Sequence, residues 1–344
     1  MNRIIIAIST MFILPIIAFG QQTLSESILH DNIQRDYIIH IPNSYNNNVS
    51  SPLVFCFHGY GGNATNLVLY TNFNYVSDTA NFIVVYPQGT LDNQATSHWN
   101  VGGWTAGSTV DDVGFISSLI DSISTQYNIN QERIYSTGMS NGGYMSFLLA
   151  CQLSEKIAAI ASVTGSMTPG MFNACNPQHP TPILQLHGTN DLTVPYLGNP
   201  AWTVSIENVL QYWVDYNNCD NSSIITPIAD ISPFDGSTVE RISWLNGDNS
   251  VITEHLRVIG GGHDWFGSWG NMDIHSTAEI WKFFSKYDIN GLIGSSTEIG
   301  DIRIKDKKLL KLIDLLGREI KEKTNEPLFY IYDDGTVEKR ITID

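Results

Sequence analysis

Short apolar runs that end in glycine or turn residues alternate along the chain with longer segments in which apolar residues recur at helical spacing. Several of these runs are apolar almost throughout, which is typical of strands covered on both faces of a sheet. The pattern predicts strands at residues 35–41, 53–57, 82–86, 133–137, 157–163, 183–186 and 251–259.

Helical patterns lie between these runs. In residues 111–127, the side chains of Phe115, Leu119 and Ile123 share one stripe of a helix. Further helical segments are predicted at residues 141–152, 202–216 and 276–284. Strands that alternate with helices need crossover connections, so we expect an α/β sandwich with a mainly parallel sheet.

The N-terminal segment has a different pattern. Arg3 precedes an almost wholly apolar run at residues 4–19, and Ala18 and Gly20 place small residues where a signal peptidase cleaves. We interpret residues 1–20 as a signal peptide and therefore expect a secreted or cell-surface protein. No later run is long and apolar enough to span a bilayer, so we expect no integral membrane segment after cleavage.

The alternation stops near residue 290. We expect residues 21–290 to form the main domain, residues 291–296 to be a linker and residues 297–344 to be a small β-rich C-terminal appendage. Within the appendage, Asp334-Gly335 lies between two β-like runs and predicts a hairpin.

Charge separates the same two parts. The formal net charge is −16, but residues 297–344 hold ten of the 18 Lys and Arg residues and 11 of the 34 acidic residues. The part before residue 297 therefore has a net charge of −15. A domain this acidic is a poor partner for nucleic acid or anionic lipid, and we exclude both.

Gly138-Met139-Ser140-Asn141-Gly142 matches the G-x-S-x-G pattern of a serine nucleophile. The pattern is weak by itself, because a turn rich in glycine and serine also matches it. Here a predicted strand precedes the motif and a predicted helix follows it, which is the strand-turn-helix context that the chemistry requires. Ser140 is therefore the candidate nucleophile.

A serine hydroxyl needs a base, and the base needs a carboxylate that fixes its tautomer. In this type of fold the acid and then the histidine follow the serine along the chain. Asp191 comes directly after the strand at 183–186, and His263 follows Gly260-Gly261-Gly262 after the last strand. We predict the triad Ser140, Asp191 and His263; His275, which precedes a helix, is the alternative base.

The loop Gly59-Tyr60-Gly61-Gly62 follows an early strand, where an oxyanion hole is expected. We assign the two donors to the backbone N–H of Tyr60, or alternatively Gly61, and that of Asn141. No lysine with a following serine or threonine comes after the glycines, so a phosphate-binding loop is excluded.

Trp99, Trp104, Trp265 and Phe266 are candidate surfaces for an aromatic acyl group or a sugar ring, with ordinary packing as the alternative. Four cysteines allow three complete pairings. Cys151 and Cys175 flank one connection and are the favoured pair, whereas Cys56 lies in an apolar strand and is expected to be a buried thiol. None of the cysteines has the CxxC spacing of a zinc site, so we expect no metal.

Five motifs in this order resemble the polyhydroxybutyrate depolymerase and feruloyl esterase family, which is related to carbohydrate esterase family 1. They are His58-Gly59-Tyr60-Gly61-Gly62, Val110-Asp111-Asp112-Val113-Gly114-Phe115, Gly138-Met139-Ser140-Asn141-Gly142-Gly143, His187-Gly188-Thr189-Asn190-Asp191 and Gly261-Gly262-His263-Asp264-Trp265.

The resemblance covers about residues 30–290. It implies an α/β-hydrolase fold, the same triad and a Cys151–Cys175 bridge. The chain departs from the family pattern at two places. The region around Trp244 lacks a cysteine that family members often have, and Phe266 stands where a proline is common.

The segments 308–319 and 328–339 look like the C-terminal sorting domain of the type IX secretion system of Bacteroidota. This resemblance implies that the appendage interacts with an export machinery; a structural or carbohydrate-binding appendage is the alternative.

The resemblance implies a serine carboxylic ester hydrolase that needs no cofactor and no metal. The expected substrates are feruloyl or acetyl esters of plant polysaccharides, and the alternative is a polyester of the polyhydroxybutyrate type. A third possibility is a surface binding protein that keeps the hydrolase scaffold without catalysis; the complete triad argues against it.

Overall fold

The computed structural model describes residues 22–105, 107–294, 309–313, 327–332 and 337–341. The predicted signal peptide and the Asp334-Gly335 turn lie outside the described residues. The chain divides into one compact unit up to Ser295 and a second from Ser296. Among the described residues, no helix is long and apolar enough to cross a membrane.

A ten-stranded sheet forms the centre of the first unit, with the order β1-β2-β4-β3-β7-β8-β9-β12-β11-β10. The six strands from β4 to β12 in this order run parallel, and the outer strands at both edges are antiparallel. The parallel strands are β3 (Ser51–Phe57), β4 (Ile83–Pro87), β7 (Ile129–Met139), β8 (Ala159–Val163), β9 (Ile183–Gly188) and β12 (Thr253–Ile259). The predicted α/β-hydrolase sandwich is therefore confirmed.

The outer strands were only partly predicted. β2 (Ile33–Ile41) agrees with the expected strand, whereas β1 (Gln22–His30), β10 (Ile224–Pro227) and β11 (Thr238–Trp244) have no counterpart in the prediction. β1 is mostly exposed, β10 has only four residues, and β11 mixes polar and apolar side chains, so none of them is a continuous buried run.

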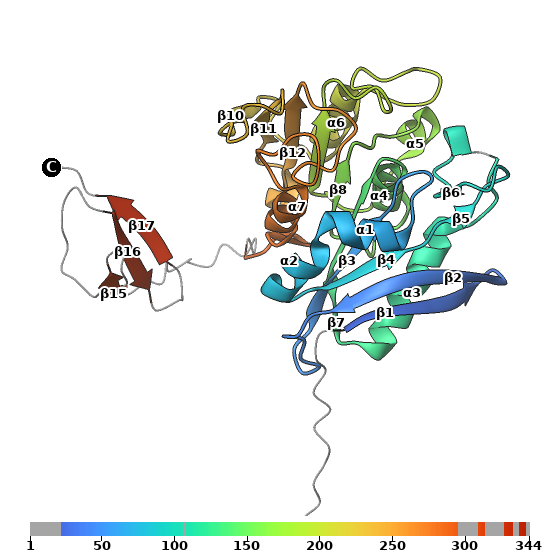
Figure 1. Cartoon of the computed structure of the whole chain (residues 1–344), viewed down its shortest axis with the longest axis horizontal. Helices are drawn as coiled ribbons and strands as arrows, with labels where there is room; N and C mark the ends of the chain where they lie inside the picture. Colours follow the sequence, from blue (N-terminus) through green and yellow to red (C-terminus); the bar gives the residue numbers. More distant parts are fainter. Residues whose placement is uncertain (1–21, 106, 295–308, 314–326, 333–336, 342–344) are drawn as a thin grey trace, which may run out of the picture. The chain divides into compact units, whose positions relative to one another are not determined.

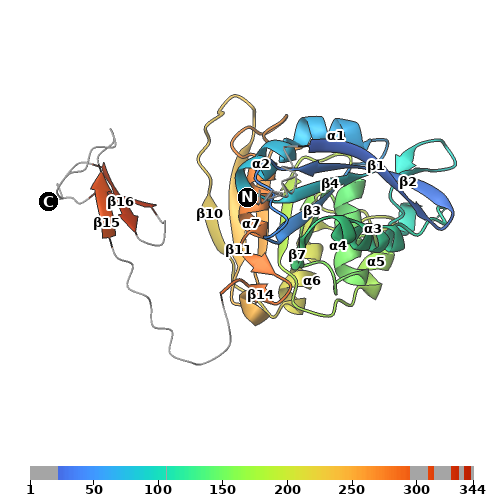
Figure 2. The same ribbon diagram turned by 90° about the horizontal axis from the view of Figure 1, so that it is seen from below.

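Helices cover both faces of the sheet (Figures 1 and 2). Successive side chains of β3 alternate: Phe55 and Phe57 pack in one core, and Val54 and Cys56 pack in the other. The first core includes α3 (Asp112–Gln126), α4 (Asn141–Gln152) and α6 (Ile206–Tyr216). The second includes α1 (Ala64–Thr71), α2 (Phe73–Ala80) and α7 (Ser276–Phe284).

Three short elements lie near the start of α3 in the sequence. β5 (Thr90–Leu91) and β6 (Ser97–His98) form a small hairpin, and the 3-10 helix η1 (Gly103–Thr105) follows it. α5 (Pro169–Ala174) comes after β8. These elements shape the surface around the carboxyl ends of the strands.

The predicted linker at residues 291–296 begins too early. β14 (Gly291–Leu292) pairs with β13 (Tyr287–Asp288), and the Ile293 N–H donates to the Lys286 carbonyl. The prediction began too early because a glycine is typical of tight turns as well as of linkers. The φ of Gly291 is 113°, which suits the turn between β13 and β14.

The second unit is described by three strands. β15 (Leu309–Ile313), β16 (Pro327–Tyr332) and β17 (Val337–Ile341) form an antiparallel sheet with β16 in the middle. The predicted pairing of the last two strands is thus observed.

Candidate active site

Ser140 lies at a sharp turn between the end of β7 at Met139 and the start of α4 at Asn141. Its φ is 55° and its ψ is −120°, a conformation that costs a residue with a side chain about 1–3 kcal/mol. The Ser140 N–H donates to the Val163 carbonyl of β8 at 2.8 Å, which helps to hold the strained turn.

Gly142 makes this turn possible. A Cβ at position 142 would lie 2.1 Å from the Phe57 carbonyl oxygen of β3, so only glycine lets α4 start this close to the sheet. The G-x-S-x-G pattern is therefore a packing requirement as well as a chemical signature.

Asp191 and His263 are brought together by the loops after β9 and β12. His263 Nδ1 lies 2.7 Å from Asp191 Oδ2, and the Asp191 carboxylate is fully buried. Its other oxygen accepts the N–H groups of Thr193 and Val194, both at 2.8 Å. The carboxylate is thus fixed in position and directed at the imidazole, as a group that sets the tautomer of a base must be.

The two loops hold each other. The Asn190 N–H donates to the Gly261 carbonyl at 2.9 Å, and a Cβ on Gly188 would collide with the backbone of Gly261 and Gly262. Glycines therefore let the histidine loop lie against the aspartate loop, 72 residues earlier in the chain.

Among the described residues, the hydrogen bonds of His263 include the one to Asp191 and none to Ser140. β7, β9 and β12 run parallel in one sheet, so their carboxyl ends place Ser140, Asp191 and His263 at the same edge. Bonds between a nucleophile and its base are often long without substrate and tighten when it binds.

The oxyanion loop lies against the nucleophile. A Cβ on Gly59 would be 3.3 Å from the Ser140 Cβ and 3.9 Å from its Oγ. The Gly61 N–H already donates to the Ser97 carbonyl at 2.8 Å, so Gly61 is not the donor. Within the described part of the chain, the Tyr60 N–H has no acceptor, which leaves Tyr60 as the candidate.

Asn141 provides the other candidate donor, because the first N–H groups of α4 have no partner within the helix. The positive end of the helix also favours an oxyanion there. The Asn141 side chain accepts the Trp99 N–H at 2.7 Å and donates to the Trp99 carbonyl at 3.1 Å. These two bonds fix the loop that contains Trp99.

Two histidines that sequence reasoning quoted but did not assign support the site. His58 Nδ1 donates to the Gly59 carbonyl at 2.8 Å, and its Nε2 accepts the Gly89 N–H at 2.9 Å. His187 Nε2 lies 2.9 Å from the Val194 carbonyl oxygen and 3.4 Å from Asp191 Oδ2. Burial lowers the pKa of each to about 4, so both are neutral and act by hydrogen bonding.

Three of the four aromatic residues predicted to bind substrate belong to the core. Trp99, Trp265 and Phe266 are fully buried and cannot form a substrate surface, so this prediction is wrong for them. A tryptophan pattern alone cannot separate the core from the site, because both use large aromatic side chains. Trp104 is 36% exposed and contacts Tyr60 and Tyr144 edge-on.

Cys151 and Cys175 form a disulfide, as the resemblance implies. It joins the last turn of α4 to the end of α5. Cys56 and Cys219 are free and buried. The helix that follows Ser140 is thus tied covalently at its far end.

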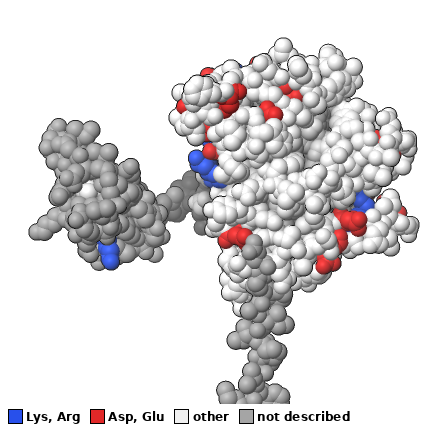
Figure 3. All heavy atoms as spheres, in the orientation of Figure 1, with Lys and Arg blue, Asp and Glu red and all other residues white. Residues whose placement is uncertain are grey.

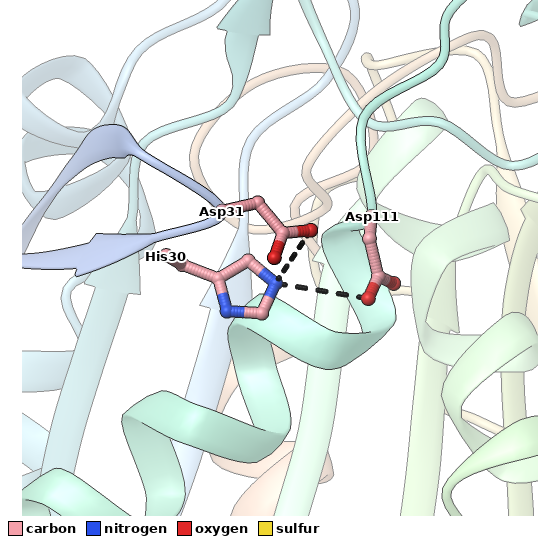
Figure 4. A group of neighbouring side chains, drawn as sticks. All are labelled: His30, Asp31 and Asp111. Atoms are coloured by element: carbon pink, nitrogen blue, oxygen red, sulfur yellow. Dashed lines mark ion pairs between the residues drawn. The ribbon is translucent and has the colours of Figure 1, made fainter.

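One group of described residues could hold a cation (Figure 4). His30 and Asp31 lie at the β1–β2 turn, and Asp111 is the N-cap of α3. His30 Nε2 is 3.7 Å from a carboxylate oxygen of each, and the two carboxylates are 67% and 55% exposed. The group comes from elements that do not contribute the triad.

Acidic side chains also characterise the surface. On the face shown in Figure 3, Asp and Glu form several small patches, and Lys and Arg form no extended one. This agrees with the acidic net charge of the chain.

Comparison with known proteins shows a similarity to esterases. Residues 36–176, which include Ser140, match the profile of the family described as esterase PHB depolymerase. A bifunctional acetylxylan esterase/xylanase of Neocallimastix patriciarum is 27% identical over 275 residues, which are 80% of this chain but only 36% of that protein. Feruloyl esterase D of Neurospora crassa is 25% identical over 78% of this chain and 86% of its own length.

The solved structure of an acetyl xylan esterase from Aspergillus awamori superposes with a TM-score of 0.56. It is 15% identical and covers 77% of this chain and 99% of its own. At this identity the superposition supports the fold.

Proposed function

We propose that this esterase of the α/β-hydrolase fold, related to feruloyl and acetylxylan esterases, is a secreted serine enzyme that forms an acyl-enzyme at Ser140. One observation carries the proposal: the buried Asp191 carboxylate lies 2.7 Å from His263, at the sheet edge where the strained Ser140 turn lies. A strained serine turn at the same sheet edge as a fixed base is the arrangement that a serine nucleophile requires, and it argues against a binding protein without catalysis.

In the proposed reaction, His263 takes the Ser140 proton as Ser140 Oγ attacks the ester carbonyl. The tetrahedral oxyanion accepts hydrogen bonds from the Tyr60 and Asn141 N–H groups; losing one such donor typically costs about 3 kcal/mol of transition-state stabilisation. His263 then gives the proton to the leaving alcohol, and water activated by the same imidazole releases the acid.

The substrates we propose are feruloyl or acetyl esters of plant polysaccharides. The alignments to an acetylxylan esterase/xylanase over 80% of this chain and to a feruloyl esterase over 78% of this chain support this choice. A polyester of the polyhydroxybutyrate type is the alternative, since the matched family has that name. Leu192 and Leu197, which are 94% and 81% exposed in the loop after Asp191, would suit such an apolar chain.

The test compares three substrates with the same enzyme. Hydrolysis of p-nitrophenyl acetate by the wild type and its loss in Ser140→Ala would establish the serine mechanism. Release of ferulate from methyl ferulate, or of acetate from acetylated xylan, set against clearing of a polyhydroxybutyrate emulsion, separates the two substrate classes. Full activity in Ser140→Ala would refute the mechanism.

We also propose that the chain is exported, with residues 1–20 as the signal and residues 297–344 as a sorting domain. The support is the sequence resemblance together with the separate β unit that begins at Ser296. Deletion of residues 297–344 should leave the esterase inside the outer membrane, and unchanged release into the medium would contradict the proposal.

A further inference from the structure

A cavity of about 320 Å³ lies beside the oxyanion loop. Its walls come from Tyr60, from the β5–β6 hairpin and from the residues around η1 and after it. The labels β5 and β6 locate the hairpin at the edge of the domain in Figure 1. The residues that matter below are Tyr60, Asp92, Asn93, His98 and Trp104.

Tyr60 connects this cavity to the proposed chemistry. Its backbone N–H is the candidate oxyanion donor, and its side chain, 45% exposed, lines the cavity. Trp104 packs edge-on against the Tyr60 ring with 5.8 Å between the ring centroids, and it makes the same contact with Tyr144 of α4. A group bound here therefore lies next to the ester that Ser140 attacks.

Hydrogen-bond acceptors line the wall in fixed positions. Asp92 Oδ2 accepts the Tyr60 hydroxyl at 2.6 Å, while its Oδ1 accepts the N–H groups of Gln94 and Thr96. These bonds lower the pKa of Asp92, so the carboxylate stays ionised. The wall therefore presents a fixed anion beside two aromatic side chains.

His98 adds an acceptor that the described protein does not use. The residue is only 2% exposed, and its Nδ1 donates to the Thr90 carbonyl at 3.1 Å. Nε2 is then the acceptor nitrogen, and it has no partner among the described residues. A buried polar atom without a partner requires an explanation, and a bound hydroxyl group would provide one.

We propose that this cavity is a subsite for one neutral sugar ring of the alcohol part of the ester. Sugar hydroxyls can donate to acceptors such as Asp92 and His98, and the aromatic Tyr60 and Trp104 can cover the apolar face of the ring. The inference rests on the proposed esterase function and extends it to the side of the leaving group.

The volume and the charge of the cavity narrow the choice of ligand further. The volume is at the lower end of the range for ligand pockets, about 300–1,000 Å³, so the cavity takes one ring rather than a length of polymer. The Asp92 carboxylate repels an acidic sugar, so a neutral pentose or hexose is favoured over a uronic acid. Because most of the lining side chains are polar, a sugar fits better than a feruloyl ring with one hydroxyl group.

The test measures binding without turnover. Xylotriose is titrated into full-length Ser140→Ala by calorimetry, and we expect saturable binding with a Kd of about 1 mM. Adding Trp104→Ala or Asn93→Ala should weaken it at least fivefold, and His98→Gln should do the same if the variant folds. Trp281→Phe is the control, because Trp281 stacks on Phe82 at α7 and is not a lining residue of the cavity.

Three outcomes would overturn the subsite. Xylotriose does not bind saturably, or it binds Trp104→Ala and the control variant with equal affinity. In the third outcome, Trp104→Ala weakens the binding of ferulate but not that of xylotriose. The last result would make the cavity an acyl pocket. If the wild type hydrolyses p-nitrophenyl acetate and xylotriose does not bind, the subsite fails and the esterase function stands. If xylotriose binds and no ester is hydrolysed, the cavity is a sugar-binding site and the proposed esterase function fails.

Discussion

Two groups in this protein place a histidine near carboxylates: His263 has one such partner and His30 has two, and the groups differ in burial and in distance. His263 is 2.7 Å from the fully buried Asp191 carboxylate, whose second oxygen accepts two backbone N–H groups. His30 is 3.7 Å from the carboxylates of Asp31 and Asp111, which are largely exposed. Water and salt screen the second group, whereas the first has a buried carboxylate at short range, where the attraction is screened less.

The comparison shows that burial and fixed hydrogen bonds, rather than residue types, distinguish a candidate catalytic pair from a surface ion pair. It also predicts a graded series of effects.

The largest effect is expected at Asp191. Asp191→Asn keeps the shape but favours the wrong tautomer of His263, so kcat on p-nitrophenyl acetate should fall about 10⁴-fold. The same change in the exposed group, Asp31→Asn, is the matched control. Equal rates for the two variants would contradict the assignment of Asp191.

The next largest effect concerns a buried ion pair. Arg35 Nη2 lies 2.6 Å from Asp112 Oδ1, and both side chains are almost fully buried. Arg35→Met leaves Asp112 buried without its partner and should lower the free energy of unfolding by about 3–5 kcal/mol, measured in urea. Lys156→Met breaks the exposed pair with Asp121 and should cost less than about 1 kcal/mol.

Acid should act through the buried neutral histidines. Burial lowers the pKa of His58 and of His187 from 6.5 to about 4, so between these values the unfolded chain binds more protons than the folded one. The stabilisation is complete above pH 6.5 and is lost as pH falls to about 4, by about 3 kcal/mol for each histidine. Urea unfolding across this range checks the slope, and His187→Gln should reduce it.

The smallest effect is expected at the exposed group. Asp31 has a φ of 48°, which asparagine also tolerates, so Asp31→Asn should change the free energy of unfolding by less than about 0.5 kcal/mol. Thermal unfolding at low and high salt measures it. A loss of 2 kcal/mol or more would show that His30, Asp31 and Asp111 are a structural centre.

The sequence by itself determined the framework. Buried parallel strands are continuous apolar runs, so the six central strands were visible without the structure, and so were the turn at Ser140 and the order of Asp191 and His263. The outer strands β1, β10 and β11 were missed, because they are not continuous buried apolar runs.

Only the tertiary structure decided which neighbours these residues have. Burial placed Trp99, Trp265 and Phe266 in the core, and the bond from the Gly61 N–H to Ser97 left Tyr60 as the candidate oxyanion donor. The contact of His187 with Asp191 depends on how a loop folds back after β9. Periodicity along a chain specifies which face of an element is apolar, but hydrogen bonds between distant loops depend on packing in three dimensions.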